Sequence, residues 1–562
     1  MSRFDHSKYP AFQTLDMPNR QWPDKRITKA PAWCSVDLRD GNQALIDPMN
    51  VAQKMQMFKL LVNVGFKQIE VGFPAASQPD FDFVRRLIDE DLIPDDVTVQ
   101  VLTQARKELI ERSFESLQGA KSAVMHLYNS TSTVQREKVF ELDREGIKAI
   151  AIDGAKIVKT CAAQQDDTDW IFQYSPESFT GTEIDYAVEV CDAVMDVWQP
   201  STEKPCIINL PATVEVATPN VYADQIEWFC SHLANRDAAV ISLHTHNDRG
   251  CAVAAAELAV MAGADRVEGT LLGNGERTGN MDIVTMAMNL YSQGIDPELD
   301  LSNMDEIIRC IKACTQLPVH PRHPYAGELV FTAFSGSHQD AIRKCLNKRE
   351  ESDLWEVAYL PIDPSDLGRS YQEVIRINSQ SGKGGVAYVL EQEHGMQIPR
   401  WLQIDFSGVV QKHAEVTEAE VGPEAIGSLF TRQYIEQFTP YELKGYQLSR
   451  ENKQERLSAT VIYRDETINL HGSGTGVVGA FVDALQSHSG KQIVLVEYSE
   501  HALSNSAGAD AATYVQLSVD GQRYCGVGKS RDIVSASLQA ILSATNQPLL
   551  LEMVGEQETA LA

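Results

Sequence analysis

The feature that most constrains the fold is an alternation of short apolar runs with amphipathic helical patterns between about residues 31 and 305. Helical periodicity recurs at residues 52–64, 80–89, 186–197, 222–234 and 251–262. Eight apolar runs are predicted strands, at residues 33–38, 68–73, 97–102, 123–128, 170–174, 206–210, 239–243 and 266–272. Eight strands, each followed by a helix, predict an α/β fold of the closed parallel (β/α)8 type, a TIM barrel. A doubly wound open sheet is the alternative, but no glycine-rich phosphate turn follows the first strand.

Polar side chains gather where these predicted strands end. The first strand ends in Asp37-Leu-Arg-Asp-Gly-Asn-Gln43, the seventh in His244-Thr-His-Asn-Asp248, and Gly273-Asn-Gly-Glu-Arg-Thr-Gly-Asn280 follows the eighth. Further polar residues belong to the fourth, fifth and sixth strands or the turns after them: His126, Glu177 and Thr213. Each alone could be a cap or turn residue. Because a barrel brings the carboxyl ends of its strands to one rim, their convergence predicts a single site.

His244 and His246 should point the same way, because side chains alternate between the two faces of a strand. An isolated His-x-His is more often a pair of ordinary hydrogen-bonded side chains than a metal site. Asp40 would add a carboxylate and Asn280 an amide oxygen, leaving positions open for substrate and water. We therefore predict a divalent-metal site, and such mixed ligands suit Mg²⁺, Mn²⁺ or Zn²⁺.

Three other rim residues each have two possible roles. Arg39 could neutralise a developing oxyanion or form a salt bridge at the rim. Glu177 is a candidate acid, base or metal-supporting group, or else a carboxylate at a helix N-terminus. Thr213 could bind a substrate carboxylate or cap a turn.

The chain is predicted to contain four regions: an N-terminal arm at 1–30, the barrel at 31–305, linker subdomains at 306–438 and a last domain at 439–562. In the last domain two units each run strand, strand, Gly-x-Gly, helix, which predicts a duplicated α+β fold. Gly474-Thr-Gly-Val-Val-Gly479 fits a dinucleotide fingerprint, but the second unit does not keep it. A tight strand-to-helix turn explains both copies better, and no nucleotide site is predicted.

Charge and cysteine usage exclude several kinds of partner. With 49 Lys and Arg against 78 Asp and Glu the net charge is −29, which argues against nucleic acid and anionic membranes. The ten cysteines include no Cys-x-x-Cys pair and are expected to be reduced thiols. The N-terminus has no apolar signal segment and no run approaches membrane-spanning length, so a cytoplasmic protein is expected.

The three rim motifs together resemble the signatures of the acyl-CoA Claisen-condensing barrels, and the chain is most similar to the long-form 2-isopropylmalate synthases. The likeness runs from residue 31 to the C-terminus. It includes four later motifs: Ser335-Gly-Ser-His-Gln-Asp340, Ala358-Tyr-Leu-Pro-Ile-Asp-Pro364, Asn378-Ser-Gln-Ser-Gly-Lys-Gly-Gly385 and Glu500-His-Ala-Leu503.

The resemblance implies a metal-dependent acyltransferase that condenses acetyl-CoA with 3-methyl-2-oxobutanoate and water to give 2-isopropylmalate and CoA. This is the first committed step of leucine biosynthesis. It implies Mg²⁺ as the first choice of metal, with the ligands Asp40, His244, His246 and, in or near the shell, Asn280. Arg39 would stabilise the alkoxide formed from the ketone.

The resemblance also implies roles for residues that physical reasoning leaves undecided. His126 and Thr213 would lie near the 2-oxoacid and Glu177 beside the reacting groups. His338 and Tyr359 would come from the linker of the partner subunit in a homodimer, to deprotonate the acetyl group. The last domain would bind leucine as a feedback inhibitor, with the loop at 504–510 as the candidate for its contacts.

Other functions remain open at this stage. A citramalate or homocitrate synthase would keep the metal site, and one methylene in the substrate pocket is worth only roughly 1–3 kcal/mol. A carbon–carbon lyase would run related chemistry in reverse. A metal-dependent hydrolase is disfavoured because the His-x-His lies on the seventh strand rather than an early one. An amino-acid sensor with a vestigial barrel is disfavoured because Arg39, Asp40, His244 and His246 are all intact.

Overall fold

The structure is a computed structural model that describes residues 4–371, 383–417, 421–451, 454–503 and 510–561. The chain divides into two compact units, one formed by residues 1–330 with 364–369 and the other by 331–363 with 370–562. In the described part of the chain, no helix combines the length and apolarity needed to cross a membrane. All ten cysteines are unpaired.

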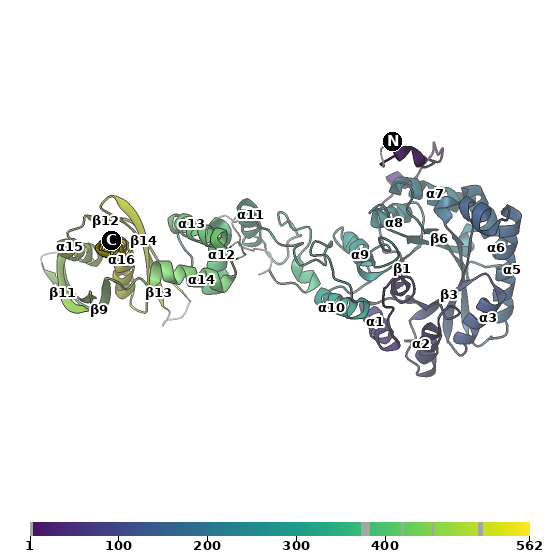
Figure 1. Cartoon of the computed structure of the whole chain (residues 1–562), viewed down its shortest axis with the longest axis horizontal. Helices are drawn as coiled ribbons and strands as arrows, with labels where there is room; N and C mark the ends of the chain where they lie inside the picture. The colour runs from purple at the N-terminus through teal and green to yellow at the C-terminus, as the bar shows by residue number, and fades with distance from the viewer. Residues whose placement is uncertain (1–3, 372–382, 418–420, 452–453, 504–509, 562) are drawn as a thin grey trace. The chain divides into compact units, whose positions relative to one another are not determined.

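The first unit is a closed barrel of eight parallel strands that pair in chain order, which confirms the predicted fold. The strands are β1 (Ala32–Ser35), β2 (Gln68–Gly72), β3 (Thr98–Gln104), β4 (Ser122–Ser130), β5 (Asp169–Glu177), β6 (Cys206–Ala212), β7 (Ala239–Thr245) and β8 (Arg266–Gly269). The helices that surround them (Figure 1) are α1 (Val51–Val64), α2 (Gln78–Asp89), α3 (Lys107–Ser116), α5 (Arg144–Ala162), α6 (Ile184–Trp198), α7 (Pro219–His232), α8 (Ala252–Met261) and α9 (Ile283–Tyr291). A short α4 (Thr133–Gln135) precedes α5, and α10 (Met304–Thr315) packs on α1.

The helices begin and end where local chemistry favours it. Asn50 and Gln53 form a reciprocal capping box at the start of α1, which ends at Gly65 with φ 111°. The side chain of Ser77 caps α2 and that of Asp143 caps α5. These caps satisfy backbone N–H groups that have no partner inside the helix.

Three predicted strand ends are wrong by three residues, while the other five differ by one or two. The predicted first strand stops at Ser35, and Asp37–Gly41 form a turn of π-helix, η3. β8 stops at Gly269 rather than at residue 272, because Leu272 takes a left-handed conformation with φ 61°. β5 runs beyond residue 174 and ends at Glu177. The segments that follow β1 and β8 therefore enter the rim as turns, and β5 reaches the rim as a strand.

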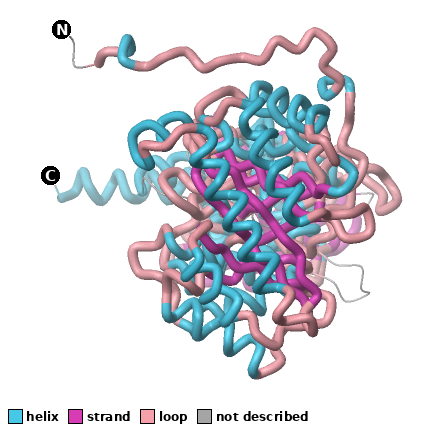
Figure 2. Tube along the Cα trace, turned by 90° about the vertical axis from the view of Figure 1, so that its right-hand side faces the viewer, coloured by secondary structure: helices cyan, strands magenta, loops and turns pink. Residues whose placement is uncertain are grey.

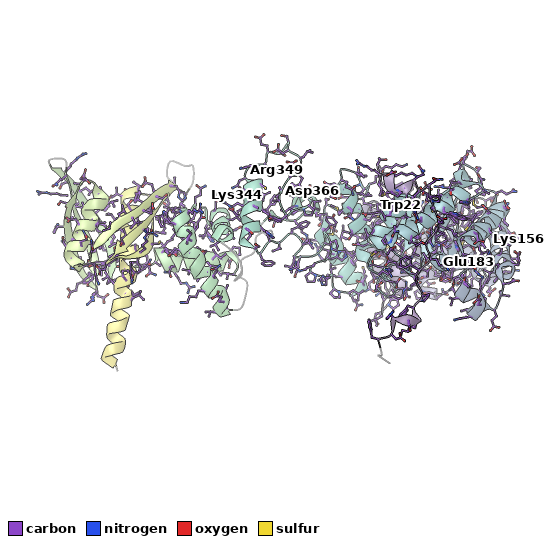
Figure 3. The ribbon with its side chains drawn as sticks, turned by 90° about the horizontal axis from the view of Figure 1, so that it is seen from above. Trp22, Lys156, Glu183, Lys344, Arg349 and Asp366 are labelled. Carbon is purple, nitrogen blue, oxygen red and sulfur yellow. The ribbon has the colours of Figure 1, made fainter. Side chains whose placement is uncertain are left out.

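The N-terminal segment crosses the outside of the barrel and contains only short turns of helix (Figure 2). Its anchor is α7. Trp22, labelled in Figure 3, donates from Nε1 to Asp224 at 2.8 Å, and Arg20 forms an ion pair with the same carboxylate at 2.6 Å. The backbone N–H of Gln21 donates to Glu227 at 3.0 Å.

The second unit begins with helices and ends with the predicted duplication. Its helices are α11 (Gly336–Leu346), α12 (Lys383–His394), α13 (Arg400–Thr417) and α14 (Pro423–Phe430). Two three-stranded antiparallel sheets follow, one of β9 (Tyr441–Glu451), β10 (Gln454–Tyr463) and β11 (Glu466–Gly474), the other of β12 (Ile493–Ala502), β13 (Ala511–Val519) and β14 (Gln522–Ser530). The two helices α15 (Val477–Ser489) and α16 (Ile533–Leu561) pack against them around one apolar core. The predicted region boundaries themselves remain predictions.

The Gly-x-Gly pairs have a different role from the predicted turn. Gly472 and Gly474 lie within β11, and Gly526 and Gly528 within β14. A Cβ atom on Gly472 or Gly526 would overlap a backbone carbonyl of the helix packed above it. The glycines therefore allow each helix to approach its sheet closely.

Candidate functional site

Three residues converge at the carboxyl end of the barrel: Asp40 on η3, His244 on β7 and His246 just after β7. One ligand atom from each lies within 4.8 Å of the others, and all three residues are buried. Asp40 Oδ2 is 3.3 Å from Nε2 of His244 and 3.6 Å from Nε2 of His246. Asn280 is buried and pairs through its backbone with His246.

The donor set fits a divalent cation. Asp40 Oδ2 and Asn280 Oδ1 are buried acceptors with no hydrogen-bond partner among the described residues. A buried acceptor without a partner is costly, and a bound cation removes that cost. Two imidazoles with a carboxylate form a mixed nitrogen and oxygen ligand set that suits Mg²⁺, Mn²⁺ or Zn²⁺.

The charges at this site are strongly interdependent. Burial opposes the charge of His244, but the nearby carboxylates of Asp40 and Glu268 outweigh that effect and raise its pKa to about 9. Burial and the nearby charge of His244 lower the pKa of His246 to about 4. Burial disfavours ionisation of Asp40, yet Arg39 and the two histidines hold the pKa of its carboxyl well below the usual range. The site thus keeps an anionic ligand ready at neutral pH.

A cavity of about 240 Å³ opens at the same rim. It brings together seven of the residues predicted from the sequence: Arg39, Asp40, His126, Glu177, Thr213, His244 and His246. The other residues that line it are Gln43, Phe73, Leu102, Tyr128, Ser175, Asn209, Pro211, Glu276 and Arg277. Positive, negative and apolar groups all face this space, as small-molecule sites require.

Arg39 is held in place by two carboxylates. Its Nη1 donates to Asp40 Oδ1 at 2.7 Å and its Nε to Glu70. Burial disfavours the charge, but Glu70 and Asp40 outweigh it and raise the pKa of Arg39 above its usual value. The guanidinium is therefore a fixed cation beside the candidate metal ligands.

The remaining rim residues are tied together across strands. The hydroxyl of Ser130 donates to the Glu177 carboxylate, joining the ends of β4 and β5. Thr213 Oγ1 accepts from the backbone N–H of Ser178 at 2.9 Å. His126 Nε2 lies 2.7 Å from Ser175 Oγ. These bonds fix side chains that face the cavity from three neighbouring strands.

Sequence reasoning missed the polar network that fills the barrel beneath the cavity. Its fully or almost fully buried members are Glu70, Gln100, Gln173, Asn209, Arg266 and Glu268. Arg266 and Glu268 alternate with apolar residues on β8, so both point inward. The signal that could have revealed this network is the pair of charged residues at alternate positions of a strand that is otherwise apolar.

His338 and Tyr359 belong to the second unit. Their rings stack with centroids 4.0 Å apart, and both side chains are exposed. Neither is among the described residues that line the cavity. Of the other motifs, residues 378–382 and 504–509, which include most of the guessed leucine loop, lie outside the described residues.

Comparison with protein families finds a match for three parts of the chain. Residues 30–311 match the HMGL-like family. Residues 328–391 match the "Alpha-isopropylmalate synthase, post-catalytic domain-like" family. Residues 420–549 match the "LeuA allosteric (dimerisation) domain".

Curated relatives match over nearly the whole chain. The 2-isopropylmalate synthase of Parafrankia sp. (strain EAN1pec) is 58% identical over 548 residues, covering 96% of this chain and 97% of that protein. The 2-isopropylmalate synthase of Pseudomonas entomophila (strain L48) is 56% identical over 544 residues, with the same coverage. Among solved structures, hydroxymethylglutaryl-CoA lyase from Pseudomonas aeruginosa aligns with 19% identity and a TM-score of 0.42, covering 52% of this chain and 95% of that one.

Proposed function

The chain belongs to the 2-isopropylmalate synthase family of acyltransferases in leucine biosynthesis, and on that premise we propose the substrates and the residues that act on them. The substrates are acetyl-CoA and 3-methyl-2-oxobutanoate, which condense with water to 2-isopropylmalate and CoA. The observation that carries this assignment is the buried cluster of Asp40, His244 and His246, which lines a cavity of about 240 Å³ together with Arg39.

Asp40, His244 and His246 would hold a divalent cation, with Asn280 in or beside its shell. When bound, the cation would supply Lewis-acid polarisation of the ketone of the 2-oxoacid. We favour Mg²⁺ because the family resemblance implies it, with Mn²⁺ and Zn²⁺ as alternatives, since a mixed set of carboxylate and imidazole ligands does not choose among the three. The unpaired acceptors of Asp40 and Asn280 support this role.

Arg39 would stabilise the alkoxide that forms when the ketone carbon is attacked. Its guanidinium is permanently charged, buried and already oriented, so little reorganisation is needed as negative charge develops. His126 and Thr213 line the same cavity and would orient the 2-oxoacid. Glu177 faces it from the end of β5 and would act beside the reacting groups.

Deprotonation of the acetyl methyl group requires a base next to the thioester. We assign this step to His338, with Tyr359 stacked on its ring. The assignment rests on the resemblance of the motifs around these residues to the family, in which the partner subunit of a homodimer would supply them. The match of residues 420–549 to a dimerisation domain supports an oligomer.

The domain at 439–562 would bind leucine and inhibit the barrel at 31–305. The family match to an allosteric domain supports this role. The linker at 306–438 and the arm at 1–30 complete the proposed organisation. The absence of a membrane-spanning helix among the described residues, together with ten free cysteines, supports a cytoplasmic location.

The decisive experiment measures CoA release from acetyl-CoA with a panel of 2-oxoacids, each with and without chelator and with and without leucine. We expect a preference for 3-methyl-2-oxobutanoate, loss of turnover with chelator, and inhibition by leucine. His244→Ala should abolish turnover with the fold intact.

The other outcomes discriminate between the remaining functions. Preference for pyruvate or 2-oxoglutarate would make the enzyme a citramalate or homocitrate synthase. Turnover that survives chelation and His244→Ala would refute the metal assignment. Absence of CoA release with every acceptor would favour a lyase or an amino-acid sensor.

A further inference from the structure

Glu268 lies directly beneath His244, inside the barrel, and only 1% of the residue is exposed to solvent. Its Oε2 is 2.8 Å from His244 Nδ1 and 3.3 Å from Asn209 Nδ2. Its Oε1 accepts from Arg266 Nη1 at 2.7 Å and from Gln173 Nε2 at 2.8 Å. Both oxygens are therefore surrounded by donors.

This arrangement leaves no place for a proton on Glu268. Gln100 Nε2 also donates to Oε1, at 3.2 Å, so each of these neighbours directs a donor at the carboxylate. An ionised carboxylate can only accept hydrogen bonds, so Nδ1 of His244 must be the donor. The nitrogen on the other side of that ring, Nε2, is the one that faces Asp40 Oδ2.

We propose that Glu268 is a positioning residue that holds a proton on His244 Nδ1, so that Nε2 is the nitrogen left for the metal and any proton on Nε2 is the one that the metal displaces. Arg266, buried with no exposed surface, fixes Glu268 in turn. The inference rests on the metal role given to His244 in the proposed function. It extends the site one layer into the barrel, since ligating histidines depend on the group bonded to their other nitrogen.

The substitution Glu268→Gln tests this in a nearly isosteric side chain. Arg266 cannot give up its protons, so the amide oxygen must face Arg266. The amide NH2 group then faces His244 Nδ1, which has to become an acceptor. The proton of a neutral His244 moves to Nε2 and blocks the atom that should bind the metal.

The measurement is Mn²⁺ affinity of the full chain, from the electron paramagnetic resonance signal of the free ion. We expect Glu268→Gln to weaken Mn²⁺ binding 10- to 100-fold, the usual effect of losing such a support. The Mn²⁺ concentration for half-maximal turnover should rise by the same factor, while KM for acetyl-CoA stays unchanged. If Glu268 only supported the fold, the Mn²⁺ requirement and KM for acetyl-CoA should both change.

Asp224→Asn is the matched control, because Asp224 is also a buried carboxylate that accepts from an arginine, but on the outer helix α7. It should leave Mn²⁺ affinity unchanged. Glu268→Asp keeps a negative charge beside Arg266, but its shorter side chain moves the carboxylate away from His244. It should therefore weaken Mn²⁺ binding less than Glu268→Gln does.

Two results would overturn the inference: Glu268→Gln binding Mn²⁺ within about twofold of the unmodified chain, or, should that variant not fold, Glu268→Asp doing so. If the unmodified chain binds no Mn²⁺, the metal assignment of the proposed function fails instead. The two failures are thus distinguishable.

Discussion

Asp37, three residues before the candidate metal ligand Asp40, is a carboxyl group that the barrel buries almost completely. Its Oδ2 accepts from Ser35 Oγ at 2.8 Å, and both oxygens lie 3.2 Å from the backbone N–H of Leu271. Burial raises the pKa of Asp37 to about 7, and Asp282 contributes in the same direction. The folded chain therefore binds this proton more tightly than the unfolded chain does.

We predict that Asp37→Asn flattens the pH dependence of stability between pH 4 and 7. Below the unfolded pKa of 3.8 the protonated group contributes its full stability, and that contribution is lost as pH rises through about 7. Each pKa unit corresponds to about 1.4 kcal/mol. Urea unfolding, followed by tryptophan fluorescence at a series of pH values, measures the free energy of unfolding of both chains. An unchanged slope in the variant would contradict the assigned pKa.

At the residue scale, the sequence was enough to identify candidate site residues that lie in short motifs at the ends of strands. His244, His246 and Asp40 could be found because a short motif and the barrel topology together place them at one rim. The partners of Glu268 could not be found in this way, because they include residues on distant strands: Gln100 is 168 residues away along the chain. His338 and Tyr359 were reached only through family resemblance, since an exposed histidine on a helix carries no signal of its own.

At the scale of elements, Arg277 joins three loops of the rim. Its Nε donates to Asp248 Oδ1 at 2.6 Å and its Nη2 to the backbone carbonyl of Thr213 at 2.5 Å. The loops after β6, β7 and β8 are thereby fixed to one another. Thr213 is a proposed contact of the 2-oxoacid, so the clamp should determine how well that substrate is held.

Arg277→Ala should raise KM for 3-methyl-2-oxobutanoate about tenfold or more, because the hydrogen bond from a charged donor is worth roughly 1.5–3 kcal/mol. KM for acetyl-CoA should change much less. Arg236→Ala is the control: Arg236 makes a similar ion pair with Asp265 at 2.7 Å, but before β7 begins. Equal effects of both variants on KM would show that general loosening of the barrel, not the clamp, is responsible.

The duplicated glycines support a second prediction about elements. Gly526→Ala should destabilise the duplicated domain by at least 1–3 kcal/mol, because its Cβ would overlap Ala540 of α16. Gly479 is exposed on α15 with open space around it, so Gly479→Ala should stabilise the same domain by up to about 1 kcal/mol. Urea unfolding measures the free energy of unfolding of the two variants. Similar effects of the two variants would refute the close-packing role.

The alternation of strands and helices predicted the barrel and the duplication, because hydrophobic period is a local property of the chain. The role of the Gly-x-Gly pairs was not predictable, since local sequence does not say which backbone will lie against a glycine. The ends of β1 and β8 were missed for the same reason: hydrogen bonds of η3 and the β8 loop involve partners far away in the chain, such as Asp37 with Leu271.

At the scale of the molecule, each compact unit would carry a binding site of its own. The barrel unit contains the candidate metal site, and the second unit contains the proposed leucine-binding domain. A ligand that binds only the folded form stabilises the unit that binds it, by about 2.7 kcal/mol at a concentration 100 times its Kd. The two ligands should therefore act on different parts of the unfolding profile.

Scanning calorimetry of the full chain should show two transitions that respond to different ligands. Removing divalent metal with a chelator should lower the Tm of the barrel transition, and leucine should raise the Tm of the other. Asp40→Asn should abolish the response to metal and keep the response to leucine, because Asp40 belongs to the barrel unit alone. If leucine raised only the barrel transition, its site would have to lie in the barrel. Inhibition would then be competition at the active site rather than regulation by a separate domain.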